Sequence, residues 1–295
     1  MNINAFPLWT AIITPMHSNG EIDYASLERL VRSQEDAGVA ILVLGSTGEA
    51  LNLDEHERKK IIEFVCGLNV KVPLMAGIGG INLNETMEWL KYLESMPLHA
   101  YLMVTPLYAR PGVEGQFHWF KTLMDKATKP CMLYNIPGRT GISLQWKALE
   151  KLKGHPRLWA IKEASGKTQD FQRYSDIDPN LLVYSGDDAL LPQYVPLKAR
   201  GLVSVAGNVW PAPTLAYSKK ALAQKLDQEE QTLWRECAET LFIASNPVPV
   251  KRLMAELKLI GDDNVRPPLS SADLESAGVL IEAHARIQKW FKDQQ

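Results

Sequence analysis

Eight short apolar runs, each followed by a polar or amphipathic stretch, are the feature that most limits how this chain can fold. Continuous apolar runs without strict alternation are typical of strands buried on both faces, and helical segments between them are typical of parallel βαβ units. Eight such units close into a (β/α)8 barrel. The runs are LWTAIITP at 8, AILVLG at 40, VPLMAGI at 72, AYLMVTP at 100, PCMLYNIP at 130, LWAIKEA at 158, LLVYSGD at 181 and GLVSVAG at 201.

Residues that cap helices support the helical reading of the intervening segments. Asp54 and Glu57 have the spacing of a capping box before HERKKIIEFV, and Gly38 stands where a helix is expected to end.

The strand pattern stops after about residue 225. Three amphipathic segments follow, around residues 233–241, 250–257 and 280–290, and the pairs Asn246-Pro247 and Pro267-Pro268 separate them. The sequence therefore predicts a catalytic barrel at 1–224 and a C-terminal helical domain at 225–295.

Composition excludes several classes of partner. The 295 residues are 46% apolar and carry a formal net charge of -2, so no broad positive field is present to attract nucleic acid or an anionic membrane. The start resembles no signal peptide, and no apolar stretch approaches the roughly 20 residues that span a bilayer. Cys66, Cys131 and Cys237 are widely spaced in apolar surroundings, which suits reduced thiols. We expect a cytoplasmic protein.

Lys162 gives the strongest chemical signal. Catalytic groups of such barrels stand at the C-terminal ends of the strands, and alternation puts Lys162 on one strand face with Ala160 and Ala164. Most lysines are solvated, but a strand covered on both faces offers no water. Burial disfavours the ammonium and lowers its pKa, and the neutral amine is a nucleophile. The pattern predicts an imine between Lys162 and a ketone.

Imine chemistry needs a proton shuttle, because a hydroxyl is lost and regained at the carbon joined to the amine. Tyr134, Thr47 and Tyr108 each fall at the end of a predicted strand, and they are the candidate relay. Tyr134 also fits a core aromatic with its hydroxyl at the rim, and the sequence does not separate these two roles.

Two segments are candidates for binding carboxylates. The turn Gly45-Ser46-Thr47-Gly48 offers backbone N–H groups and hydroxyls to a small anion such as the carboxylate of a 2-oxo acid, although it also fits a plain tight turn. No lysine follows Gly48, so the turn is no phosphate loop. Arg139, after a Pro-Gly pair, suits a second carboxylate, whereas most arginines are simply solvated.

Metal chemistry is not indicated. The six histidines include no pair at ligand spacing and no HExxH motif. Asp187 and Asp188 are interpreted as capping groups rather than as magnesium ligands. No metal or other cofactor is expected.

Six motifs in this order carry a resemblance that runs nearly end to end: GSTGEA, VTPLYARP, YNIPGRTG, IKEASG, SGDDA and SNPVPVK. They resemble the N-acetylneuraminate lyase and dihydrodipicolinate synthase superfamily. Within it, the segments 134–139 and 246–251 are similar to dihydrodipicolinate synthase. The resemblance implies a class I lyase that condenses pyruvate with aspartate semialdehyde on the route to diaminopimelate and lysine.

The resemblance also implies roles for the candidate residues. Lys162 would form the Schiff base, and Tyr134, Thr47 and Tyr108 would relay protons, with Tyr108 reaching into the site of a neighbouring subunit. The implied assembly is a homotetramer made of two tight dimers.

Substrate contacts are implied in the same way. Ser46 and Thr47 would hold the pyruvate carboxylate, Arg139 would hold that of the aldehyde, and Gly186 and Val203 would line the pocket through their backbones. Ser46 replaces a threonine common in the family but keeps the hydroxyl.

The site at which lysine inhibits some family members departs further from the pattern. Leu53, Ile81 and Leu107 stand where those members carry polar or aromatic groups, although His56 and Glu85 match. Because a cationic amine would lack partners beside leucine and isoleucine, we expect weak or absent inhibition by lysine.

Two alternatives remain open. One is a lyase that cleaves N-acetylneuraminate or a 2-keto-3-deoxy sugar acid, against which Arg139 argues. The other is a barrel that binds a 2-oxo acid without turnover, but that protein would be expected to lack the relay residues and Lys162.

Overall fold

The computed structural model describes residues 1–294 and shows a closed barrel of eight parallel strands in chain order, with β8 paired to β1. All eight predicted runs contain a strand, so the predicted (β/α)8 fold class is confirmed. The strands are β1 (Leu8–Ala11), β2 (Ala40–Val43), β3 (Leu74–Ile78), β4 (Ala100–Val104), β5 (Cys131–Asn135), β6 (Leu158–Glu163), β7 (Leu182–Ser185) and β8 (Gly201–Ser204).

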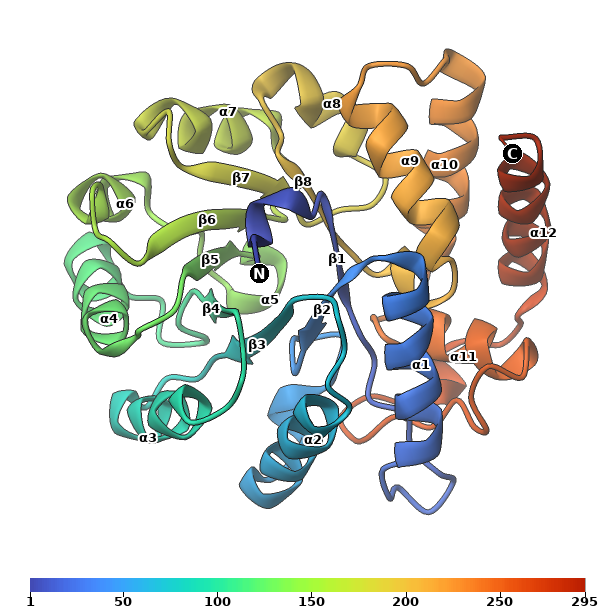
Figure 1. Cartoon of the computed structure of the whole chain (residues 1–295), viewed down its shortest axis with the longest axis horizontal. Coiled ribbons are helices and arrows are strands. Elements are labelled where there is room, and N and C mark those ends of the chain that lie inside the picture. Colours follow the sequence, from blue (N-terminus) through green and yellow to red (C-terminus); the bar gives the residue numbers. More distant parts are fainter. Residues whose placement is uncertain (295) are drawn as a thin grey trace.

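A ring of helices surrounds the strands (Figure 1). Its members are α1 (Tyr24–Ala37), α2 (Glu55–Gly67), α3 (Leu83–Glu94), α4 (Val113–Lys126), α6 (Trp146–Leu152), α7 (Thr168–Ile177), α8 (Leu191–Tyr194) and α9 (Pro211–Leu222). The short α5 (Pro137–Thr140), directly after β5, lies over the barrel instead (Figure 1). The predicted caps are confirmed: Asp54 and Glu57 form a capping box at the start of α2, and Gly38 ends α1 in the left-handed conformation.

Short 3-10 turns complete the chain's secondary structure: η1 (Ile3–Ala5), η2 (Ala50–Asn52), η3 (Val195–Leu197), η4 (Ala206–Asn208) and η5 (Ser271–Asp273). Across residues 1–294, the structure contains no helix with the length and apolar character needed to cross a bilayer.

Three C-terminal helices lie together on one side of the barrel, beyond α9 and α1 (Figure 1). They are α10 (Gln228–Thr240), α11 (Val248–Glu256) and α12 (Gly278–Lys292), and they match the three predicted segments. The boundary predicted at 224/225 falls between α9 and α10. The division into two domains stays a prediction.

The core has two layers. The larger lies between the strands and the helices, and the smaller fills the barrel interior. The N-terminal end of the interior is plugged by aromatic rings, because Trp159 packs against both Trp9 and Tyr184 with ring centroids 6.0 and 5.8 Å apart. Asn4 of η1 accepts a hydrogen bond from the Trp159 indole. The open mouth is therefore the opposite end, where the strands finish.

Candidate active site

Lys162 lies inside the barrel, near the end of β6, with 4% of its surface exposed. In the parallel register it faces Tyr134 of β5, and its Nζ is 4.4 Å from the centre of the Tyr134 ring. Within residues 1–294, Lys162 takes part in no ion pair. The amine therefore lies against an aromatic ring and has no carboxylate partner among the described residues.

Gly186, directly after β7, makes room for the Lys162 side chain. A Cβ at Gly186 would lie 2.9 Å from Lys162 Cε and 2.7 Å from Ala164 Cβ, both too close for ordinary contact. Because Gly186 has no side chain, the Lys162 side chain can follow its observed path toward the mouth of the barrel.

We expect Gly186→Ala to lower kcat/KM by roughly 10- to 100-fold, because the added methyl displaces the lysine amine by a fraction of an ångström. Steady-state turnover with pyruvate and the aldehyde measures the effect. Gly67→Ala is the control, since a Cβ at Gly67 meets no atom within 4 Å. Unchanged kinetics for Gly186→Ala would show that the lysine does not depend on this space.

The turn after β2 presents unused backbone donors. Gly48 N donates to Gly45 O and Glu49 N donates to Ser46 O, whereas the N–H groups of Ser46 and Thr47 donate to no protein acceptor in the described chain. The hydroxyl of Thr14 donates to Gly48 O at 2.7 Å, which ties this turn to the segment that follows β1. Two free N–H groups with neighbouring hydroxyls form an arrangement suited to a small carboxylate.

Asn246, in the segment before α11, links two of the predicted site residues. Its Nδ2 donates to Thr47 Oγ1 at 2.9 Å, and its backbone carbonyl accepts from Arg139 Nη2 at 2.9 Å. With the Asn246 amide as donor, the Thr47 hydroxyl keeps its own proton free to donate elsewhere. The sequence marks Asn246 only as part of a break between helical segments and of the SNPVPVK motif, and it predicts no role for the side chain.

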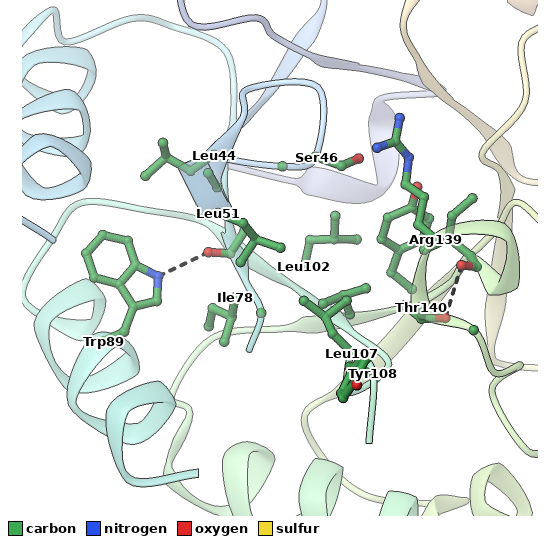
Figure 2. A pocket seen from close by; sticks show the side chains of 18 of the residues that line it. Leu44, Ser46, Leu51, Ile78, Trp89, Leu102, Leu107, Tyr108, Arg139 and Thr140 are labelled. Atoms are coloured by element: carbon green, nitrogen blue, oxygen red, sulfur yellow. Dashed lines mark hydrogen bonds between the residues drawn. The ribbon is translucent and has the colours of Figure 1, made fainter. Parts of the chain in front are cut away.

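A cavity of about 580 Å³ opens over β2 to β5. Figure 2 shows Arg139 beside Ser46 at one end, Trp89 at the other, and Leu51 and Leu102 between them. Arg58, Arg110 and Arg139 are its charged lining residues, and no aspartate or glutamate of the described chain joins them. An apolar cavity whose only fixed charges are positive favours small anions.

The structure brings some predicted residues to the cavity and not others. Ser46, Tyr108, Tyr134 and Arg139 line it. The remaining four lie outside its lining: Thr47, Lys162, Gly186 and Val203. Thr47 is buried beside Asn246, and Val203 is fully buried in the barrel interior.

Tyr108 stands apart from the other relay candidates. It is 90% exposed, and its backbone is in the left-handed region with φ of +57°. Within a single chain it therefore does not complete a relay with Tyr134, and its insertion into a neighbouring subunit stays a prediction.

The interpretation of Asp187 and Asp188 as groups that cap a helix is wrong, because α8 begins after Leu190 and no side chain caps it. Asp187 Oδ1 does accept from Ala189 N. Asp188, however, accepts from the backbone N–H of Val205 and bonds to Ser204, so it ties β7 to the end of β8. Burial raises the pKa of Asp188 to about 6. No group of three or more potential metal ligands occurs among residues 1–294.

A buried polar pair lies behind the predicted catalytic residues, on the outer face of the strands. Asn135 Nδ2 donates to Glu163 Oε2 at 2.6 Å, one residue beyond the Tyr134 and Lys162 register pair. Burial raises the pKa of Glu163, although Ser165 and Asn135 hydrogen bonds oppose the shift. This bond holds the ends of β5 and β6 together.

Comparison with known proteins covers nearly the whole chain. The model of the Dihydrodipicolinate synthetase family matches residues 6–283. The chain belongs to this family. The family predicted from the sequence motifs is thereby confirmed.

Named relatives agree with this assignment. A 4-hydroxy-tetrahydrodipicolinate synthase of Francisella tularensis subsp. novicida is 45% identical over 284 residues, which is 96% of each chain. Among solved structures, a chloride-inhibited dihydrodipicolinate synthase from Acinetobacter baumannii, complexed with pyruvate, has a TM-score of 0.89 at 32% identity and covers 96% of this chain and 99% of its own. A DHDPS from Cyanidioschyzon merolae with lysine bound has a TM-score of 0.90 at 30% identity, covering 97% and 99%.

Proposed function

We propose that this chain is a lyase that condenses pyruvate with L-aspartate 4-semialdehyde, through an imine at Lys162, to give 4-hydroxy-tetrahydrodipicolinate for diaminopimelate and lysine biosynthesis. The observation that carries the proposal is the Lys162 amine, held inside the mouth of the barrel over the Tyr134 ring without a carboxylate partner. The names of the relatives support the choice of substrates.

The proposed chemistry begins with attack of Lys162 Nζ on the keto carbon of pyruvate. The resulting hydroxyl leaves as water and an iminium remains, whose positive nitrogen draws electrons from the neighbouring carbon. Loss of a methyl proton gives an enamine, which forms a carbon–carbon bond to the aldehyde carbon while the aldehyde oxygen takes up a proton and the iminium forms again. The amino group of the condensed aldehyde then attacks the iminium carbon, which closes the ring and releases the Lys162 amine. Tyr134 lies beside the amine, and in this scheme its hydroxyl carries these protons, with Thr47 and Tyr108 as relay partners.

The two carboxylates are proposed to bind at different groups. The free N–H groups of Ser46 and Thr47 receive the pyruvate carboxylate. Arg139 uses one N–H on Asn246 O and keeps its other donors for the carboxylate of the aldehyde. Gly186 and Val203 line the pyruvate site through their backbones in this proposal.

Borohydride trapping tests the proposal directly. Reduction in the presence of pyruvate is expected to add the mass of the reduced pyruvate imine to the peptide that contains Lys162. Turnover with aspartate semialdehyde, N-acetylneuraminate and 2-keto-3-deoxy sugar acids, assayed in parallel, identifies the second substrate. Absence of any adduct would contradict imine chemistry, and an adduct without turnover would indicate a binding protein.

We further propose that the cytoplasmic protein works as a homotetramer of two tight dimers. Tyr108, Leu51 and Ile81 are large apolar side chains that are 90%, 64% and 56% exposed, the first two of them at the cavity. Large apolar side chains with this much exposed surface are typical of protein interfaces. Sedimentation equilibrium measures the assembly, and a monomer at micromolar concentration would contradict it.

Lysine is expected to inhibit this enzyme weakly or not at all. Leu53 is buried and Ile81 is exposed with no polar group to offer, while Arg58 and Arg110 at the cavity repel an ammonium. We expect less than about twofold loss of rate at millimolar lysine, which corresponds to under roughly 0.4 kcal/mol of coupling. Strong inhibition at that concentration, in an assay with both substrates near KM, would contradict the expectation.

A further inference from the structure

A fully buried ion pair joins the C-terminal helices to the turn that follows β2. Lys251 of α11 and Glu49 both have side chains with 0% exposure, and their Nζ and Oε1 atoms are 2.5 Å apart. Lys251 Nζ also donates to the carbonyl of Asn264 at 2.7 Å, and Glu49 Oε2 accepts from the Arg266 backbone N–H at 2.9 Å. Both charged groups therefore have further hydrogen-bond partners in the protein.

The ion pair lies directly beside the proposed pyruvate site. Glu49 is two residues after Thr47, and its left-handed backbone, with φ of +54°, closes the same turn. Lys251 is five residues after Asn246, which donates to Thr47 Oγ1. Two contacts thus join the same two segments, although the contacting residues are about 200 positions apart in sequence.

Fold stability alone does not explain this pair. Taking two charges out of water costs several kcal/mol each, and neutral side chains of similar volume often serve the stability of a buried site as well or better. What an ion pair adds is a strict geometric demand, since its two partners must meet at one distance and direction. Burial lowers the pKa of Lys251 while Glu49 opposes that shift, so the arrangement depends on the carboxylate staying in place.

We infer that Lys251, ion-paired with Glu49, is a positioning residue that holds the Ser46-Thr47 turn in the conformation that receives the carboxylate of the 2-oxo acid. The inference rests on the proposed function, because it assumes that this turn binds pyruvate. Lys251 touches no substrate and acts only through Glu49 and the turn.

The test removes both charges at once. Glu49→Gln/Lys251→Met keeps the side-chain volumes and leaves no unpaired charge in the interior, so the thermal midpoint should stay near that of the unaltered protein. The pyruvate concentration that gives half-maximal borohydride trapping at Lys162, and the KM for pyruvate, should each rise by about 10- to 100-fold, as expected when one or two well-placed hydrogen bonds to a charged ligand are lost. The KM for the aldehyde should change by less than about threefold, because the Arg139 contact with the Asn246 carbonyl is kept.

A matched control comes from a second ion pair in the same part of the protein. Lys220 and Glu230 join α9 to α10 with side chains 29% and 10% exposed, and neither lines the cavity. Lys220→Met/Glu230→Gln should leave pyruvate saturation unchanged. If Lys251 had a purely structural role, Glu49→Gln/Lys251→Met would instead show a lower folded fraction and lower rates with both substrates.

Glu49→Asp provides a second test of the inference in case the double variant does not fold. It keeps the charge but shortens the side chain by one methylene, so the ion pair can form only by shifting the turn, and pyruvate saturation should again move to higher concentration. Half-saturation within about twofold of the unaltered value, in either folded variant, would overturn the inference. If pyruvate fails to trap on the unaltered protein, the proposed function itself fails.

Discussion

Lys162→Ala is expected to lower turnover by roughly 10⁴-fold or more, since the residue that forms the covalent intermediate is lost and only binding and orientation remain. Borohydride reduction with pyruvate should then add no mass to the corresponding peptide. The variant should fold, because alanine fits the β6 interior beside Ala160 and removes a buried amine that has no ion-pair partner.

The control for this prediction is Lys167→Ala. Lys167 lies five residues further on and is exposed, so its removal should leave both turnover and trapping unchanged. Residual turnover of Lys162→Ala near the original rate would contradict imine formation at this position, even if the family assignment stands.

Tyr134→Phe is expected to reduce kcat by about 10²- to 10⁴-fold, the range typical for loss of a proton-transfer group. Only one oxygen atom is removed, and the ring that packs against Lys162 stays in place. Pyruvate trapping should therefore slow without disappearing, because imine formation also needs protons to move. Single-turnover trapping followed by mass spectrometry measures this rate.

Tyr184→Phe provides the same chemical change at a matched position. Tyr184 pairs in register with Lys162 from the other side, on β7, but its ring packs against Trp159 near the plugged end and its hydroxyl has no hydrogen-bond partner among the described residues. We expect loss of the Tyr184 hydroxyl to leave kcat unchanged. Equal losses in both variants would mean that interior packing, and not proton transfer, accounts for the Tyr134 effect.

Local patterns in the sequence were enough to predict the barrel and the placement of its lysine. Eight apolar runs became eight strands, and alternation along β6 put Lys162 inside with Ala160. Alternation failed at the start of β6, where an irregular register turns Trp159 inward and Leu158 outward. Both signals depend on neighbours in sequence, as does the capping box of Asp54 and Glu57. Such features follow from the periods of strand and helix and need no knowledge of distant contacts.

Contacts between distant segments could not be predicted in this way. Asn246 meets Thr47 across 199 residues, and Lys251 meets Glu49 across 202. No local pattern indicates which polar groups will be buried together when the C-terminal helices pack on the barrel. Asp188 was misread for the same reason, because its partners lie at the end of β8 and directly after it, and not in its own turn. The role proposed for Tyr108 involves a second chain, whose contacts no pattern within one sequence indicates.

The aromatic rings at the N-terminal end of the barrel close that end, so the barrel interior is open only where the strands finish. Lys162 lies buried inside the barrel, and Arg139 lines the cavity over β2 to β5. If the proposed function is right, both substrates enter and the product leaves through this one open end.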